Sequence, residues 1–447
     1  MIFNLSTQST IIVVSPLVAL MKSQSENLRK RGVKAVYLQD IYEGNSEVKY
    51  NITELHEGKA DIIFASPESL LGEHRSLLIN LSKNRALKAI FVDEAHCIKK
   101  YGKTDKKRKK PAFRPQYGQL GEVRSLVQKN VPIVALTATA TKQTRELIMK
   151  DLCMTKCTQL VVNPEKKNVK YSVEITKKDL TANFKWLYDL IADLGQTCPR
   201  IIVFFRQIKQ IAEVFEYLQI SLGDRQYVPS SEDPRNGYWN RIFAMFHLTT
   251  NEDIKKCICT SFQKEDGKIR VVLCSTSFSM GLDIKGVHTV VHYGPANDLD
   301  DYLQETGRAG RDATASCNAI LLKYTRCLSS QNITTEMRQY VSATICRRLL
   351  LLKPFWEEIE PLLPKHDCCD ICSSMCRCQC LFSGTCNCIE VCSFNDSHIL
   401  TNIRNTISIQ ENDSSSESPD ESFSSDTDFE NYLAAKPNIL MSSDSDI

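Results

Sequence analysis

A short apolar run that ends in two adjacent carboxylates is the feature that most constrains this chain. Residues Ala89 to Val92 are followed directly by Asp93 and Glu94. Such a run is typical of a buried parallel strand, whose carboxyl end delivers side chains to a ligand cleft. An acidic pair there suits nucleotide hydrolysis, with Asp93 holding Mg²⁺ and Glu94 orienting or deprotonating the attacking water. Taken alone, the pair is more typical of a strand followed by a solvated acidic turn.

The apolar runs repeat along the chain in a way that predicts two α/β blocks. In the first block, strands with small polar ends are expected within 10–17, 35–38, 61–68 and 133–140. A second block begins near residue 168, and its strands are expected at 200–205, 271–276, 289–293 and 317–322. Strands that alternate with helical stretches indicate βαβ units and parallel sheets. Residues 222–245 are interpreted as a loop or insertion, the chain turns helical from about 335, and the Ser/Asp/Glu-rich end is predicted to be disordered.

Size and charge favour a multidomain protein that binds nucleic acid. A length of 447 residues predicts two to three domains. Residues 411–447 carry ten acidic and one basic residue, a charge of −9 that leaves +12 on the rest of a chain whose total is +3. A basic body with an acidic tail suits a nucleic-acid partner, although a generic basic surface has the same charge. The sequence has no apolar run of about 18 residues, so no membrane partner is expected.

A basic and aromatic stretch follows the acidic pair. Residues 101–117 combine lysines and arginines with the three rings of Tyr101, Phe113 and Tyr117. Proteins hold single strands without sequence preference by placing cations against the phosphates and aromatic rings against the bases. Taken alone, the basic run is more typical of a solvated loop or a localisation signal.

The cysteines indicate a metal site. Nine of the 19 cysteines lie between Cys368 and Cys392. Because the N-terminus has no recognisable secretory signal, metal binding is favoured over disulfides, with reduced cysteines and no metal as the alternative.

These segments together resemble the RecQ family of superfamily 2 helicases, over residues 11–372. The box Asp93-Glu94-Ala95-His96 is similar to the one that names the wider group, and Leu136–Ala140 resembles its motif III. Ser279–Asp283 resembles motif V, and Gln304–Asp312 resembles motif VI. In motif VI, two arginines three positions apart are expected to share a helix face and reach a γ-phosphate, as arginine fingers do.

The resemblance implies a set of site residues. It implies catalytic roles for Asp93, Glu94, His96, Gln304, Arg308 and Arg311, and ATP and Mg²⁺ contacts by Asp93, Gly281, Asp283, Arg308 and Arg311. It implies DNA contacts by Ser15, Pro16, Ser66, Pro67, Tyr101, Phe113, Arg114, Tyr117, Thr137 and Thr139. For Zn²⁺ it implies Cys346, His366, Cys369 and Cys372, with Cys368 as the alternative to His366. Cys376 to Cys392 fit nothing in the family pattern and leave further metal binding open.

The resemblance also sets the expected domain organisation. The fold class is α/β, with two RecA-like parallel-sheet domains, a helical zinc-binding module and a disordered acidic tail. The expected boundaries are 1–165, 166–328 and 329–375, then a Cys-rich extension at 376–405 and the tail at 406–447. ATP is expected between the two RecA-like domains. The implied activity is ATP-dependent 3′-to-5′ unwinding in DNA repair, recombination or replication. The expected partners are single-stranded DNA, duplex junctions and a protein bound by the tail, and the expected location is nuclear.

One departure from the family concerns the phosphate-binding loop. Its Gly-Lys-Ser/Thr signature belongs before the Ser15-Pro16 turn and is not found there. Gly102-Lys103-Thr104 has the right letters, but it follows the acidic box and no strand leads into it, so it is rejected. A motor without this lysine is expected to bind ATP poorly and to hydrolyse it slowly. A catalytically inactive DNA-binding fragment and an RNA helicase of the same superfamily therefore remain as alternatives, and a metal-buffering protein is a distant third.

Overall fold

The structure is a computed structural model that describes most of the chain as two compact units. The described residues are 9–41, 52–104, 111–177, 179–228, 240–279, 284–311, 316–363, 365–375 and 398–409. The chain divides after Pro164, so that unit 1 is Met1–Pro164 and unit 2 is Glu165–Ile447. The expected helical module therefore belongs to the same compact unit as the second α/β domain.

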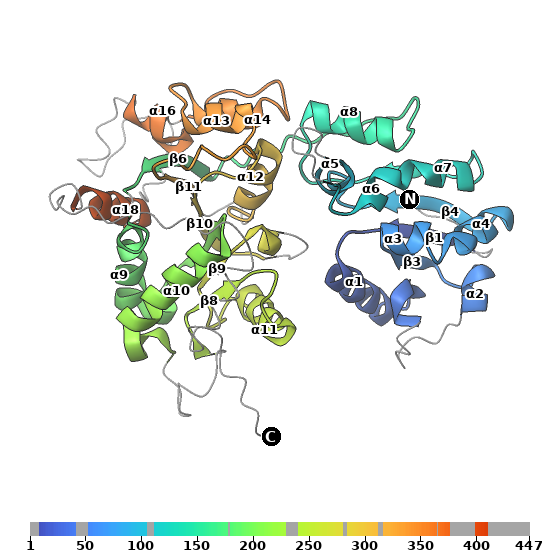
Figure 1. Cartoon of the computed structure of the whole chain (residues 1–447), viewed down its shortest axis with the longest axis horizontal. Helices are drawn as coiled ribbons and strands as arrows, with labels where there is room; N and C mark the ends of the chain where they lie inside the picture. Colours follow the sequence, from blue (N-terminus) through green and yellow to red (C-terminus); the bar gives the residue numbers. More distant parts are fainter. Residues whose placement is uncertain are drawn as a thin grey trace, which may run out of the picture. The chain divides into compact units, whose positions relative to one another are not determined.

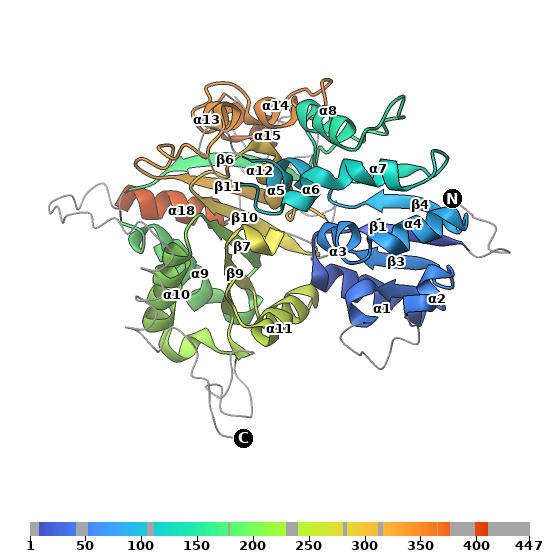
Figure 2. The ribbon, with the colours of Figure 1, turned by 45° about the vertical axis from the view of Figure 1, so that its right-hand side comes forward.

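Unit 1 is built on a five-stranded parallel sheet with the strand order β2-β3-β1-β4-β5. Figure 2 shows β1, β3 and β4 running side by side. The elements in chain order are β1 Thr10–Val14, α1 Val18–Lys30, β2 Ala35–Tyr37, η1 Leu38–Ile41, α2 Ile52–His56, β3 Ile62–Ala65, α3 Pro67–Leu71, α4 Arg75–Lys83, β4 Leu87–Val92, α5 Cys97–Gly102, α6 Pro115–Gln119, η2 Leu120–Glu122, α7 Val123–Leu126, β5 Ile133–Ala135 and α8 Lys142–Asp151 (Figure 1).

Side chains of unit 1 alternate between the two faces of this sheet, as the period of a strand requires. In β1, Ile12 and Val14 are fully buried in the larger core, which continues under α4 and the α6–α7 region. Val13 turns to the other face and packs in a smaller cluster with Met21 of α1 and Phe64 of β3. Both faces of β1 are therefore covered, which explains why its sequence is apolar throughout.

Unit 2 is built on a six-stranded parallel sheet with the order β6-β11-β10-β7-β9-β8. Its elements are β6 Val169–Ile175, η3 Ala182–Phe184, α9 Lys185–Leu194, η4 Gly195–Thr197, β7 Arg200–Phe205, α10 Ile208–Leu222, η5 Gly223–Gln226, β8 Phe243–Phe246, α11 Glu252–Gln263, β9 Val271–Cys274, η7 Thr276–Ser279, β10 Val287–Tyr293, α12 Leu299–Thr306, β11 Cys317–Lys323, α13 Thr335–Val341, α14 Arg347–Leu352, α15 Lys365–Cys368, α16 Asp370–Ser374 and α18 His398–Ile409.

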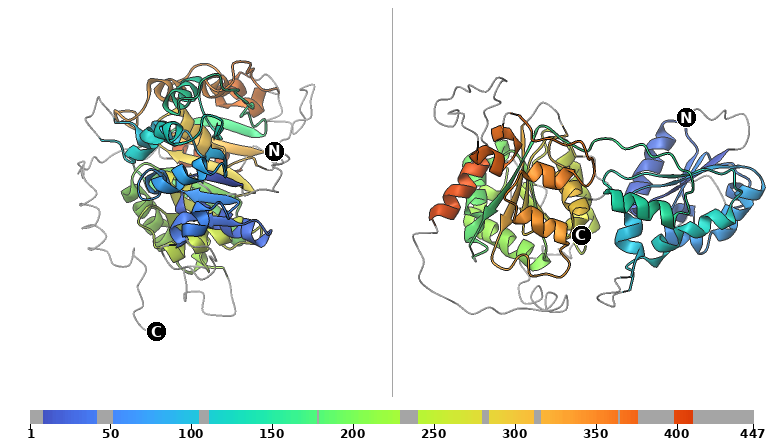
Figure 3. Two further views of the ribbon diagram at one scale, coloured as in Figure 1. Left: turned by 90° about the vertical axis from the view of Figure 1, so that its right-hand side faces the viewer. Right: turned by 90° about the horizontal axis from the view of Figure 1, so that it is seen from above.

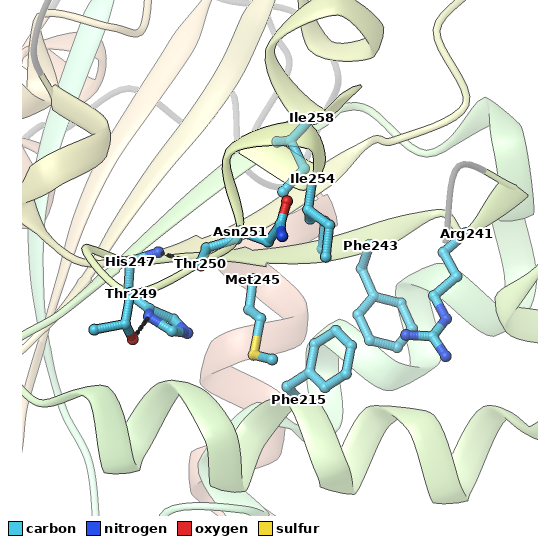
Figure 4. A pocket seen from close by; sticks show the side chains of 11 residues that line it. Phe215, Arg241, Phe243, Met245, His247, Thr249, Thr250, Asn251, Ile254 and Ile258 are labelled. Carbon is cyan, nitrogen blue, oxygen red and sulfur yellow. Dashed lines mark hydrogen bonds between the residues drawn. The ribbon is translucent and has the colours of Figure 1, made fainter. Parts of the chain in front are cut away.

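The sheet of unit 2 separates two cores. In β7, Ile201, Val203 and Phe205 face the cluster formed with α9, α10 and α18, whereas Ile202 and Phe204 face the cluster formed with α11 to α14. Figure 3 shows α18 and the α13–α14 pair on opposite sides of the strands. All six residues of β7 are buried, as expected for a central strand covered on both faces.

The α/β class and the two parallel sheets are confirmed, and the differences from expectation lie in unit 2. The interpretation of 222–245 as a loop is wrong at both ends, because α10 continues to Leu222 and β8 begins at Phe243. The helix α18 was not expected: Ile399 and Ile403 bury against the core, and Arg404 pairs with Glu174 of β6 at 2.9 Å. The helix covers part of the extension and the first residues of the expected tail, of which the remainder lies outside the described residues.

Within the described part of the chain, no helix combines the length and the apolar character needed to cross a membrane.

Candidate nucleotide, DNA and metal sites

The acidic pair lies at the carboxyl edge of the unit 1 sheet. The backbone N–H of Asp93 donates to the carbonyl of Val14 at 2.8 Å, so the residue continues the register between β4 and β1. The N–H of Ala95 then donates to the carbonyl of Leu136 at 2.8 Å, just beyond β5. Between them Glu94 adopts a positive φ of 46°, in the left-handed region that turns a chain sharply. This turn projects two consecutive carboxylates from one strand end.

The electrostatics of this turn favour a bound cation. Burial raises the pKa of Asp93, and the nearby Glu94 carboxylate raises it further. A desolvated carboxylate beside a second one is stabilised by a divalent ion, and oxygen donors are the ligands that Mg²⁺ prefers. The donor set therefore fits Mg²⁺ held by Asp93.

His96 connects the acidic turn to the segment after β5. Its Nδ1 lies 3.2 Å from Glu94 Oε2 and 3.1 Å from the hydroxyl of Thr137. Burial opposes the charged imidazolium, but Cys97 and Glu94 together raise the pKa of His96 above its usual value. The Thr137 hydroxyl donates in turn to the carbonyl of Thr139 at 2.9 Å. Two contacts therefore connect Glu94, through His96, to the segment that resembles motif III.

Several residues expected to contact DNA are buried. Ser15 and Pro16 are buried at the end of β1, and Pro67 is buried at the start of α3. Ser66 caps α3, since its hydroxyl accepts the N–H of Ser69 at 3.2 Å. Thr139 is also buried. These residues shape the carboxyl edge of the sheet, and of this group only Ser66 keeps partly exposed surface.

The aromatic segment divides into an exposed ring and a buried one. The Tyr101 ring contacts Phe113 and Tyr117 edge-on, with centroid distances of 5.5 and 6.1 Å. Phe113 is 76% exposed, whereas Tyr117 is 0% exposed. Tyr117 therefore packs in the core of unit 1, and Phe113 is the ring that is available for a nucleic-acid base.

Arg114 holds three parts of unit 1 together. It donates to both oxygens of Glu68 at 2.7 and 2.6 Å, and to the carbonyl of Pro16 at 2.8 Å. Its guanidinium lies over the Tyr117 ring at 5.0 Å. Partial burial raises the pKa of Glu68, but the hydrogen bonds and charge of Arg114, together with hydrogen bonds from the Glu68 backbone and Ser66, lower it below its usual value. Arg114, expected as a DNA contact, thus uses its three guanidinium nitrogens on the protein and ties the start of α6 to α3.

In unit 2 the two arginines of motif VI lie beyond a helix rather than on one. α12 is capped by Asp298, whose carboxylate accepts the N–H of Asp301 at 2.8 Å, and it carries Gln304 in its last turn. It ends at Thr306, so Arg308 and Arg311 belong to the following turn. The expectation of a shared helix face is therefore wrong: Arg308 is buried and Arg311 is exposed. Gly281 and Asp283 of motif V lie outside the described residues.

Four cysteines form a buried cluster whose geometry suits a metal ion. The sulfur atoms of Cys346, Cys368, Cys369 and Cys372 all lie within 4.8 Å of one another, and all four residues are buried. Tetrahedral zinc with Zn–S bonds of about 2.3 Å places its sulfurs about 3.8 Å apart. The Cys346–Cys368 sulfur distance is 3.6 Å, so the group fits one Zn²⁺ ion, which would act as a structural cross-link.

Of the two candidates for the fourth ligand, Cys368 and not His366 converges with the other three cysteines. His366 is outside the group of converging atoms, and its Nε2 lies 3.7 Å from Asp367 instead. The reason is local: α15 ends at Cys368, which turns its sulfur inward, where it accepts the N–H of Leu362 at 3.3 Å. The adjacent Cys369 pairs with Tyr171 of β6 through an isolated bridge. Spacing alone could not reveal that two consecutive cysteines converge.

Comparisons with known proteins agree with the resemblance. Residues 1–147 match the family described as DEAD/DEAH box helicase, and residues 182–313 match the helicase conserved C-terminal domain. The ATP-dependent helicase wrn-1 of Caenorhabditis elegans is 28% identical, over 83% of this chain and 34% of its own length. The ATP-dependent DNA helicase RecQ of Haemophilus influenzae is 26% identical, over 81% of this chain and 54% of its own length.

A solved structure supports the fold. Dbp5 of S. cerevisiae, bound to RNA and ADP BeF3, superposes with a TM-score of 0.50 at 17% identity, covering 76% of this chain and 77% of that one. The chain spans about a third to a half of the length of the two curated relatives named above. The two matched helicase domains and these relatives support the resemblance of the chain to the RecQ-like helicases of superfamily 2.

Proposed function

We propose that this chain is the motor region of an ATP-dependent 3′-to-5′ DNA helicase of RecQ type. The observation that carries the proposal is the turn after β4, where the Glu94 carboxylate, adjacent to Asp93, connects through His96 to Thr137. Such an arrangement couples ATP hydrolysis at the end of β4 to the segment around Thr137, which follows β5.

In this proposal each charged residue has one role. Asp93 holds the Mg²⁺ of Mg–ATP, and Glu94 accepts a proton from the attacking water. Gln304, Arg308 and Arg311 come from the second unit and stabilise the charge of the transferred phosphoryl group. Gly281 and Asp283 contribute to nucleotide binding as in the motif they resemble. The Mg²⁺ ion neutralises charge on the phosphates.

DNA binding is assigned to exposed groups on unit 1. Phe113 offers a ring for base stacking, and the lysines that precede it in the sequence attract the phosphate backbone. Tyr101, Ser66 and Thr137 are partly exposed and complete this surface. We further propose that the substrates are single strands and duplex junctions, that the acidic tail binds a protein partner, and that the chain acts in the nucleus in DNA repair or recombination.

The proposal is tested by unwinding of labelled duplexes that carry either a 3′ or a 5′ single-stranded tail. We expect ATP-dependent strand separation of the 3′-tailed DNA and little separation of the 5′-tailed DNA. An RNA duplex of the same sequence is the control for the related RNA helicases. Equal unwinding of both tails, or faster unwinding of RNA, would contradict the proposal.

Replacement of Phe113 by alanine is expected to weaken binding of single-stranded DNA about 5- to 150-fold, because stacking of one base contributes about 1–3 kcal/mol. The stability should not change, because the ring is exposed. Fluorescence anisotropy of a labelled oligonucleotide measures the affinity, and urea unfolding measures the stability.

Tyr117→Ala is the matched comparison for Phe113→Ala. Because Tyr117 is fully buried, we expect a loss of about 3–5 kcal/mol in the free energy of unfolding. If both variants lost stability equally, or if Phe113→Ala bound DNA normally, the assignment of the exposed ring to DNA would be wrong.

A further inference from the structure

A single lysine holds the backbone on both sides of Arg308. Lys166 Nζ donates to the carbonyl of Gly307 at 2.5 Å and to the carbonyl of Ala309 at 2.8 Å. These carbonyls belong to the residues immediately before and after Arg308. The direction of the Arg308 backbone is thus fixed by a side chain more than 140 residues away in sequence.

The segment around Lys166 packs closely against the rest of the arginine turn. Gly310 has a φ of +65°, and a Cβ atom at this position would lie 2.7 Å from Val169 and 3.0 Å from Asn168. Asn168 Nδ2 also donates to the carbonyl of Gly310 at 3.5 Å. The turn between Arg308 and Arg311 therefore has no room to move toward this segment.

The same segment is anchored from its other side by Arg348. This arginine is fully buried and donates to the carbonyls of Lys166 at 3.1 Å and Val169 at 2.5 Å. It also lies 3.4 Å from Glu165 and stacks over the Tyr171 ring at 5.2 Å. Arg348 belongs to α14, which begins directly after the metal-site residue Cys346. A continuous set of contacts therefore leads from the cysteine cluster to the arginine turn.

We propose that Lys166 is a positioning residue for Arg308 and Arg311, and that Arg348 holds Lys166 in place. The inference rests on the proposed role of the two arginines in ATP hydrolysis. The Lys166 ammonium is repelled by the guanidinium groups of Arg308 and Arg311. The neutral amine of Lys166 would donate to the same carbonyls with less repulsion. Burial, together with Arg311 and Arg308, accordingly lowers the pKa of Lys166 to about 8. Three clustered cations suit a turn that meets an anionic phosphate.

The first measurement is hydrogen–deuterium exchange of peptides covering residues 304–311 in the full chain. In Lys166→Met we expect amide exchange in this turn to rise at least about fivefold, because both carbonyl contacts are lost. Lys166→Arg retains a charged donor and is expected to restore most of the protection. Lys167→Met removes the exposed neighbouring lysine and is expected to leave exchange unchanged. Unchanged exchange in Lys166→Met, with normal folding by circular dichroism, would overturn the proposal.

The second measurement separates this inference from the proposed function. With DNA-stimulated ATP hydrolysis as readout, Lys166→Met is expected to lower kcat about tenfold and to leave the KM for ATP within about twofold, since the turn is misplaced rather than absent. Lys166→Arg should recover kcat. If the unchanged chain shows no more hydrolysis than Glu94→Gln, the proposed function fails, and the exchange data alone decide whether Lys166 positions the turn. Faster exchange with an unaltered kcat would overturn the catalytic part.

Discussion

Glu94→Gln is expected to lower DNA-stimulated ATP hydrolysis by at least about 100-fold, because it removes the carboxylate that accepts the proton of the attacking water. The substitution keeps the shape of the side chain, so the turn after β4 and the contact between His96 and Thr137 should persist. Binding of single-stranded DNA should therefore stay within about twofold. Phosphate release over time, with and without DNA, measures the rate.

Two outcomes of this experiment discriminate between an active helicase and a catalytically inactive DNA-binding fragment. A rate that falls in Glu94→Gln means that a working phosphate site forms even though the Gly-Lys-Ser/Thr signature is not found before the Ser15-Pro16 turn. A rate that is equal in both proteins, with DNA still bound in a salt-dependent manner, would instead support the DNA-binding fragment. Asp151→Asn is a useful control, because this carboxylate pairs with Lys103 on unit 1 and lies in α8, away from the β4 turn in sequence.

The second large effect is expected at the cysteine cluster. Cys368→Ala should remove one equivalent of zinc per chain, measured by elemental analysis, and should lower the free energy of unfolding of unit 2 by about 3–5 kcal/mol. The size of the effect follows from the position of the cluster, which is buried and joins α14, α15 and α16 to β6.

Two matched variants test the assignment of the fourth ligand. His366→Ala is expected to keep the zinc, because His366 is outside the converging group. Cys257→Ala removes a partly exposed cysteine on α11 and should change neither the metal content nor the stability. Loss of zinc in His366→Ala together with normal zinc in Cys368→Ala would restore histidine as the ligand.

Much of the site could be predicted from local sequence because its geometry is local. A strand end fixes where the next two residues point, so the position of Asp93 and Glu94 follows from the apolar run before them. The exposure of residues in irregular segments does not follow in this way. Phe113 and Tyr117 lie four positions apart and both are aromatic, yet one is exposed and the other is buried. Tyr117 lies on α6 and belongs to the core of unit 1, whereas Phe113 precedes that helix.

The zinc site shows the same limit. Spacing favoured a ligand every third residue and therefore His366, but α15 ends at Cys368, and Cys369 pairs with β6. Two consecutive cysteines then face one point. The spacing of the motif did identify the neighbourhood and three of the four converging residues.

The sequence by itself determined the α/β class, the two parallel sheets and the strand end that carries the acidic pair, because strand periodicity and apolar runs are local properties of the chain. Only the tertiary structure decided what surrounds Arg308. Lys166, Gly310 and Arg348 are distant in sequence, and their contacts depend on how β6 and α14 pack around the turn after α12. Long-range packing of this kind leaves no periodic trace in the sequence, because each contact joins single residues from separate segments.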